Sequence, residues 1–169
     1  MRRSVSLARL AQYVNGRPFK PDEFTPSGLP VVRIRQFLDP AAEPDHFDGP
    51  VEERHRLRDG DLVFCWSASL AVGTWHRGEA VLNQHLFNVR PAPAVDKRWL
   101  RWALQHSLDT FSGMMHGSAM THITKEMLRE VVVDVPSVDE QRRVADFLDD
   151  QVALLDRAIA AANRRRGLG

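Results

Sequence analysis

The fold is decided by residues 131–166, which read VVVDVPSVDEQRRVADFLDDQVALLDRAIAAANRRR. The valines within 131–135 predict a short central strand, and Pro136 ends it because proline has no N–H for the ladder. Ser137 and Glu140 then form a Ser-x-x-Glu capping box, in which the hydroxyl and the carboxylate satisfy backbone N–H groups at a helix start. The sequence therefore predicts a strand that leads directly into a long helix.

One face of this helix carries apolar residues at alternating spacings of three and four, which is the heptad pattern of a coiled coil. They are Ala145, Leu148, Val152, Leu155, Ile159 and Ala162. At about 1.5 Å per residue the helix would extend roughly 40 Å, which is too far for a domain of this size to cover. We therefore expect the stripe to pair with another helix. The alternative is a helix that folds back on its own domain.

The residues before the helix predict one compact α+β domain. Expected helices cover 7–14, 97–115 and 124–129. Expected strands cover 31–37, 62–66, 71–75 and 80–91, with a hairpin connection at 76–79. The proline-rich residues 17–30 predict an extended loop, and residues 39–59 predict an exposed acidic loop. We divide the chain into a compact domain at 1–136 and a helix at 137–169.

The formal charge of +1 hides an uneven distribution along the 169 residues. Residues 1–35 contain seven Lys or Arg against two Asp or Glu, whereas residues 36–61 contain three against eight. This pattern is compatible with a polyanionic partner and equally with ordinary solvated surface charge. Cys65 is the only cysteine, so one chain can form neither an internal disulfide nor a cysteine zinc site. Since no apolar stretch is long enough for a membrane span, the sequence predicts a soluble, cytoplasmic protein.

The sequence lacks the residue patterns of common catalytic and cofactor sites. The segment from Gly113 to Gly117 is not followed by the Lys-Ser/Thr of a phosphate-binding loop, and no G-x-G-x-x-G occurs. The seven histidines include no H-E-x-x-H spacing, and His116 and His122 would need a loop to bring them together. Cys65 lies inside an apolar run, which is typical of a buried side chain. We therefore predict no catalytic residue, no metal and no cofactor.

What remains is a set of side chains in loops and at strand ends, of types that contact phosphates and base edges in DNA. The candidates are Lys20, Arg33, Arg35, Ser67, Ser69, Trp75, Arg77, Asn83, Gln84, His85, His116, Ser118, Thr121 and His122. Arg33 and Arg35 would share one face of the expected strand at 31–37. For each residue alone, an ordinary exposed position is the plainer interpretation.

Five segments, in this order, resemble the specificity subunit of type I restriction-modification systems, and within it one of the two target-recognition halves with its trailing helix. They are 13–20 (YVNGRPFK), 28–34 (GLPVVRI), 60–63 (GDLV), 82–89 (LNQHLFNV) and 133–149 (VDVPSVDEQRRVADFLD). The last is similar to the family's P-x-x-x-E-Q-x-x-I-x-x-x-L-D signature. Each segment alone is weak evidence, whereas their order and spacing are more specific.

The resemblance implies a non-catalytic subunit that reads double-stranded DNA for a methyltransferase and restriction complex. Its implied partners are DNA methyltransferase subunits and, less directly, the restriction subunit. Family members carry two recognition domains and two long antiparallel helices, so one domain with one helix would form a homodimer or pair with a second recognition half. The helix is shorter than the resemblance implies, which leaves open a natural half-length subunit or part of a longer one.

Two other functions remain open from the sequence. One is a small nuclease or hydrolase that uses His85, His116 or His122. The other is a structural partner whose coiled-coil helix caps or regulates a related complex without contacting DNA.

Overall fold

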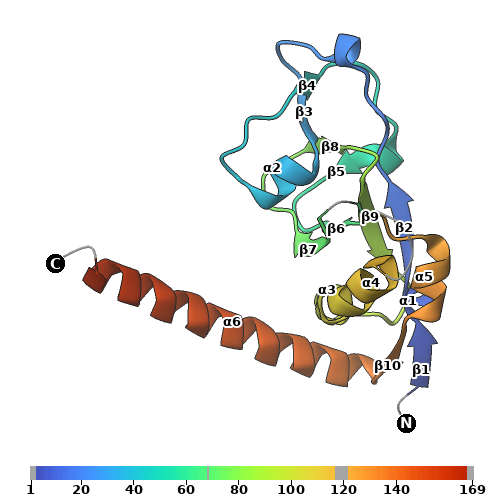
Figure 1. The fold of residues 1–169 in the computed structure, drawn as a ribbon, viewed down its shortest axis with the longest axis vertical. Helices are drawn as coiled ribbons and strands as arrows, with labels where there is room; N and C mark the ends of the chain where they lie inside the picture. The colour runs from blue at the N-terminus through green and yellow to red at the C-terminus, as the bar shows by residue number, and fades with distance from the viewer. Residues whose placement is uncertain (1–2, 68, 117–121, 167–169) are drawn as a thin grey trace.

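A long helix projects from the base of a mixed α/β body in the computed structural model, which describes residues 3–67, 69–116 and 122–166 (Figure 1). This helix, α6 (Val138–Arg166), follows β10 (Val132–Val135), which pairs antiparallel with β1 (Arg3–Ser6) in a two-stranded sheet. The N–H of Glu140 donates to Ser137 Oγ at 3.3 Å, as the predicted capping box requires. The α+β class and the long C-terminal helix are therefore confirmed.

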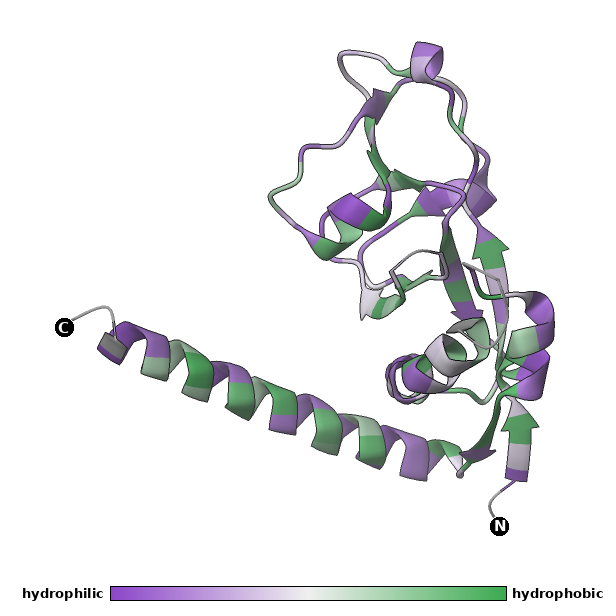
Figure 2. Cartoon of the chain, in the orientation of Figure 1, coloured by the Kyte–Doolittle hydropathy of each residue, from purple (hydrophilic) through white to green (hydrophobic). Residues whose placement is uncertain are grey.

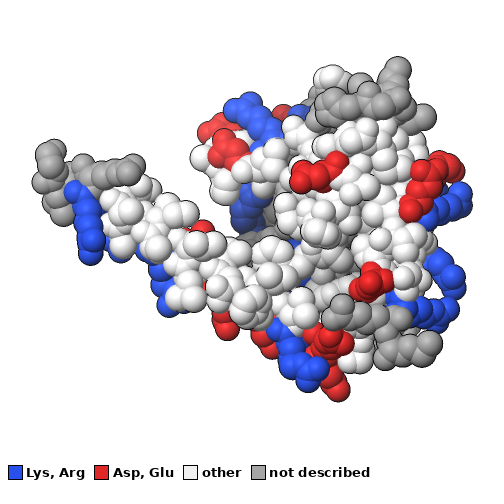
Figure 3. All heavy atoms as spheres, turned by 60° about the horizontal axis from the view of Figure 1, so that its bottom comes forward, with Lys and Arg blue, Asp and Glu red and all other residues white. Residues whose placement is uncertain are grey.

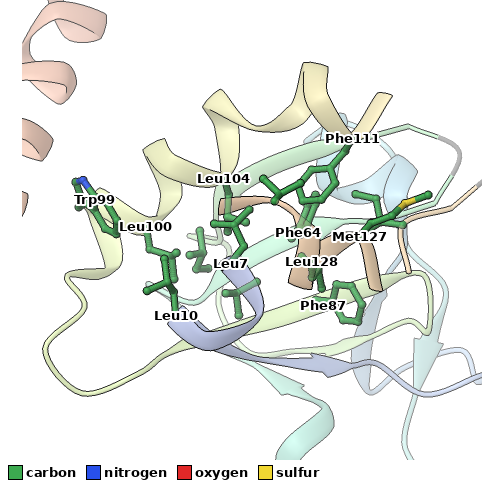
Figure 4. Packing of buried hydrophobic residues seen from close by; sticks show 14 of the residues in the cluster. Leu7, Leu10, Phe64, Phe87, Trp99, Leu100, Leu104, Phe111, Met127 and Leu128 are labelled. Carbon is green, nitrogen blue, oxygen red and sulfur yellow. The ribbon is translucent and has the colours of Figure 1, made fainter. Parts of the chain in front are cut away.

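The lower part of the body is an antiparallel sheet covered by helices. Its strands are β2 (Ala11–Asn15), β9 (Leu86–Pro91), β6 (Leu62–Cys65) and β7 (Ala71–Thr74), in that order. Its helices are α1 (Leu7–Leu10), α3 (Lys97–His106), α4 (Leu108–His116) and α5 (Lys125–Glu130). Apolar side chains of both layers, among them Phe64, Leu104 and Phe111, converge in one core (Figure 4).

The upper part of the body is a second, smaller sheet. It is formed by β4 (His46–Phe47), β3 (Leu29–Val32), β8 (Ala80–Leu82) and β5 (Arg56–Leu57), in that order. The short helices η1 (Pro21–Glu23), α2 (Ile34–Leu38) and η2 (Glu53–His55) lie in its connections. Val63 and Cys65 of β6 join the upper core, while Leu62 and Phe64 join the lower one. Burial on both faces explains why β6 is apolar without alternation.

Three predicted elements are wrong, two of them because strand pairing overrides the local pattern. The expected helix at 7–14 ends at Leu10, and Ala11–Asn15 pair with β9 instead. The expected helix at 97–115 breaks at Ser107, which separates α3 from α4. The expected hairpin of 71–75 with 80–83 does not form, since β7 pairs with β6 and β8 pairs with β3 and β5.

Two expected strands also differ in position. The strand at 31–37 stops at Val32, where the pairing of β3 with β8 ends, and α2 follows, with the Gln36 amide buried and donating to Glu43 O at 2.9 Å. Arg33 and Arg35 therefore do not share a strand face. The strand at 131–135 is not central, since β10 pairs only with β1 among the described residues and its Val132 is 54% exposed. Its valines therefore lie in a two-stranded sheet that directly precedes α6.

Helix α6 carries apolar residues, interspersed with hydrophilic ones, along its length (Figure 2). In the part of the chain that the structure describes, no helix is long and apolar enough to cross a membrane.

Candidate functional site

Five residues meet where the two parts of the body join, and we call them the Trp66 cluster: Trp66, Ser67, Gln84, His85 and His122. Because β6 and β9 run antiparallel with Cys65 opposite Leu86, the residues after β6 meet the turn before β9. His122 is brought in by an antiparallel bridge to Ser67, and the N–H of Ile123 donates to Trp66 O at 2.8 Å. Three separate segments of sequence therefore converge on one indole ring.

The Trp66 ring forms the floor of the cluster. Its centroid lies 5.9 Å from that of His85 and 5.6 Å from that of His122, and it stacks on Phe87 at 5.4 Å. Both imidazoles are exposed, and Gln84 Nε2 lies 3.4 Å from His85 Nε2. The buried Trp66 Nε1–H has no acceptor among the described residues. The cluster therefore presents donors, acceptors and an aromatic surface together, which is the chemistry that reads base edges.

Asn83 shapes this cluster from beneath. The residue is buried, its N–H donates to Val32 O at 3.0 Å, and its Oδ1 accepts from the His85 N–H at 3.4 Å. Gly16 packs directly against the same turn, where an added Cβ would lie 2.1 Å from Leu82 O. Asn83 therefore holds the Gln84–His85 turn and does not itself face solvent.

Two predicted candidates, Trp75 and Arg77, fasten α2 to the body. Trp75 is buried, and its Nε1–H donates to Gly78 O at 2.7 Å. Arg77 lies 4.1 Å from the Trp75 ring centroid and donates to Gln36 O at 2.5 Å. Loss of hydration around this guanidinium lowers its pKa from the usual value. The structure places this pair away from the Trp66 cluster, with a packing role.

The remaining basic candidates lie on the upper part of the body. Arg33 is engaged internally, with a 2.6 Å ion pair to Asp45 and a position 4.9 Å from the Phe24 ring centroid. Arg35 and Lys20 are exposed and are available to a ligand. Of the expected pair, Arg35 is thus exposed on α2, while Arg33 is held in an internal ion pair.

The loop candidates are only partly described. Ser69 is exposed next to the cluster, and its N–H donates to Ser67 O at 2.7 Å. Ser118 and Thr121 lie outside the described residues, and so does the side chain of His116.

A groove along the open edge of β2 was not predicted from the sequence. This β2 groove has a volume of about 500 Å³, and Gln12, Asn15, Arg54, His55 and Arg90 contribute its polar lining. Its two guanidiniums come from segments far apart, one of them in the nominally acidic stretch, so no local pattern marks them. Asn15 Nδ2 donates to Gln84 O at 3.1 Å and so joins this groove to the Trp66 cluster.

The structure divides the predicted stripe of α6 in two. Ala145 is fully buried and Leu148 is half-buried against the body. Leu155 and Ile159 are 61% and 58% exposed, and Val152 and Ala162 are exposed as well. The helix stands clear of the body over this distal part, and basic side chains lie toward its free end (Figure 3).

The described residues contain no group of three or more His, Cys, Asp or Glu side chains placed to hold a metal ion. Cys65 is fully buried, and burial raises the pKa of its thiol to about 12. This thiol is therefore poorly suited to act as a nucleophile.

Comparison with known proteins gives consistent matches. The family model of the type I restriction modification DNA specificity domain matches residues 53–162. The chain is 24% identical over 155 residues to the type I restriction enzyme EcoBI specificity subunit of Escherichia coli. That match covers 90% of this chain and 32% of the relative, so the chain spans about a third of its length.

Solved structures share the fold. A chain from a type I R-M system, solved in work on complex assembly and conformational transition, superposes with a TM-score of 0.74 at 23% identity over 95% of this chain and 41% of that one. The HsdS subunit from Thermoanaerobacter tengcongensis gives a TM-score of 0.67 at 23% identity, with 93% and 39% covered. The S subunit from M. genitalium gives 0.62 at 13% identity, with 95% and 42% covered.

Proposed function

The chain belongs to the family of type I restriction modification DNA specificity domains, and from this premise we propose that it recognises a short sequence in double-stranded DNA for a type I restriction-modification complex. The observation that carries this proposal is the Trp66 cluster. Exposed His85 and His122 and the amide of Gln84 stand around one ring at the surface, where a base edge can reach them.

Binding combines two kinds of contact in this proposal. The Trp66 cluster, with Ser69 and the sequence candidates His116, Ser118 and Thr121, supplies base readout. Arg90 of the β2 groove, together with Lys20 and Arg35, supplies phosphate contacts, and Arg54 of the same groove joins them by exchanging its exposed 2.8 Å ion pair with Glu52 for a phosphate. Arg33, Trp75, Arg77 and Asn83 act by holding these surfaces in place.

The proposed division of labour keeps the domain at 1–136 for DNA and the helix at 137–169 for assembly. The chain itself is non-catalytic and reads one half-site. Methylation belongs to DNA methyltransferase subunits, and cleavage to a restriction subunit. The exposed side chains Val152, Leu155 and Ile159 would be covered by a second copy of α6 or by the helix of a second recognition half.

Charge favours an antiparallel arrangement of such a pair. Residues 138–151 hold five Asp or Glu against two Arg, whereas residues 152–166 hold one Asp against four Arg. An antiparallel neighbour would place the basic end of each helix beside the acidic start of the other. A two-fold dimer of this kind would read two identical half-sites in inverted orientation.

Binding-site selection tests the proposal. The chain is co-purified with a DNA methyltransferase subunit and used to select duplexes from a random library at fixed salt. A defined motif is expected, with no cleavage by the chain alone in the presence of Mg²⁺. Selection without any motif would contradict the proposal. Metal-dependent cleavage that is lost on His116→Ala would instead favour a nuclease.

A further inference from the structure

Three residues spaced four apart on α6 attach the helix to the body, and we call Gln141, Ala145 and Asp149 the anchor residues. This spacing puts them on one helix face, directed at α3. The apolar side chains Leu155 and Ile159 stay exposed farther along the helix. One part of α6 therefore binds its own body, while another remains for a partner.

Gln141 is the first point of attachment. It is 1% exposed, its Oε1 accepts from the Asp96 N–H at 2.8 Å, and its Nε2 donates to Pro136 O at 3.0 Å and Ala94 O at 3.3 Å. Ala94 adopts a φ of 64°, which is rare for a residue with a Cβ. Gln141 thus supports both the strained turn at Ala94 and the N-cap residue of α3, Asp96.

Asp149 is the second point of attachment. Its Oδ1 accepts from Arg101 Nη2 at 2.6 Å and from Trp102 Nε1 at 2.9 Å, and Arg98 lies 3.6 Å from its Oδ2. Asp149 and Arg101 are about two-thirds buried, with side-chain exposures of 32% and 28%. Two donors on one sheltered carboxylate hold the helix more firmly than a solvated ion pair would, and Arg98 adds a second link to α6 through its 2.7 Å ion pair with Asp146.

Ala145 lies between these two points and is fully buried, so its small side chain lets α6 lie close to α3. Every residue from 150 to 160 is exposed. Residues 150–160 therefore do not pack against the body, and the direction of α6 is set by its contacts up to Asp149.

We infer that Asp149 is a positioning residue that sets the spacing between the two DNA half-sites. From Asp149 to Arg166 the helix rises about 25 Å. A tilt of about 8° at Asp149 would displace the far end by about 3.5 Å, close to the rise of one base pair. A small tilt of α6 at Asp149 thus shifts the far end of the helix by about the rise of one base pair.

This inference rests on the proposed function, so the test uses the selected half-site in the assembled protein. Duplexes carry two half-sites with the spacer varied one base pair at a time, and affinity is measured by fluorescence anisotropy. The wild-type protein is expected to discriminate against a spacer one base pair too long by about tenfold or more, comparable with one mismatched base pair. Asp149→Ala should reduce this discrimination to about threefold or less while binding to a single half-site is unchanged.

Asp150→Ala is the matched control, because Asp150 is an exposed carboxylate one position along, and it should keep the wild-type spacer preference. Asp149→Asn keeps an acceptor for Trp102 without the charge and should be intermediate. Retention of full spacer discrimination in Asp149→Ala would overturn the inference and leave the proposed function intact.

A DNA-free measurement separates the two claims. Spin labels at Arg129→Cys on α5 and Ala160→Cys on α6 report the direction of the helix in the same assembled protein. The distance between the two labels is expected to have a narrow distribution when Asp149 is present and a broader one in the Asp149→Ala variant. Unchanged distributions would overturn the positioning role even if the protein binds no specific DNA.

Discussion

Cys65 shows at the scale of one residue how two cores meet in a single strand. Its side chain is fully buried, and burial raises the pKa of the thiol to about 12. At pH 8 the thiol should therefore remain protonated as well as inaccessible, and both effects suppress reaction with a disulfide reagent.

We expect native Cys65 to react with Ellman's reagent only as the protein unfolds, measured by absorbance at pH 8 with and without urea. The Ala160→Cys variant provides the control, since its added thiol is exposed on α6 and should react at once. Rapid labelling of the wild-type protein without urea would contradict the burial of β6 between the two cores.

Single residues of the Trp66 cluster could be predicted from the sequence, whereas their grouping could not. Gln84, His85 and His122 were candidates because their types suit base contacts. Their convergence on Trp66 depends on the antiparallel β6–β9 register and on the Ser67–His122 bridge. Trp66 itself was assigned to an apolar strand, because nothing local shows that its ring carries a polar cluster.

At the scale of elements, the end of β2 lies in close backbone contact with the turn between β8 and β9. Gly16 lies at this crossing, where its N–H donates to Leu86 O at 3.1 Å and the Arg17 N–H donates to Leu82 O at 2.9 Å. An added methyl group would press on the carbonyl oxygens of Leu82 and Asn83, at 2.1 and 2.3 Å. These are backbone atoms, which cannot move away from the added methyl group by a simple rotation as a flexible side chain could.

Gly16→Ala is therefore expected to destabilise the fold by about 2 kcal/mol or more, the upper part of the range for overpacked sites. Urea denaturation measures the change in the free energy of unfolding. Gly113→Ala is the control, because the added Cβ would meet no described atom within 4 Å other than its chain neighbours and the nearby backbone of its own helix. This helical substitution should raise stability by up to about 1 kcal/mol. Equal stabilities for the two variants would contradict the close backbone contact at Gly16.

The elements that sequence predicted well are those whose signal is local. The Pro136–Ser137–Glu140 sequence correctly marked the start of α6, and the buried run at 62–66 correctly marked β6. The helix expected at 7–14 failed because β9 recruits Ala11–Asn15 into its sheet. The strand expected at 31–37 failed because its pairing with β8 ends at Val32, and neither β8 nor β9 is visible as a partner in a short window of sequence.

At the scale of the whole molecule, α6 is held by the body at one end and free at the other. Its distal side chains Leu155 and Ile159 are more than half exposed. Burial of such a stripe against another helix is favourable in free energy, because it removes apolar side chains from water.

Leu155→Glu combined with Ile159→Glu should therefore abolish self-association, measured as molar mass by light scattering over a range of concentrations. Ala153→Glu combined with Ala160→Glu is the control, since both alanines are exposed outside the predicted stripe, and it should associate as the wild-type chain does. A wild-type chain that remains monomeric alone but pairs with a second recognition half would identify the other proposed arrangement. Association that survives the Leu155 and Ile159 changes would contradict the role of the stripe.

The central claim is that the Trp66 cluster reads DNA sequence, and the affinity ratio between selected and scrambled duplexes tests it most directly. His85→Ala should lower this ratio by about tenfold at constant salt, in the range for one lost base contact, with little change for the scrambled duplex. His76→Ala is the matched control, because His76 is an exposed histidine outside the cluster. It should keep the wild-type ratio. A His85→Ala ratio equal to that of the wild-type chain would contradict the account.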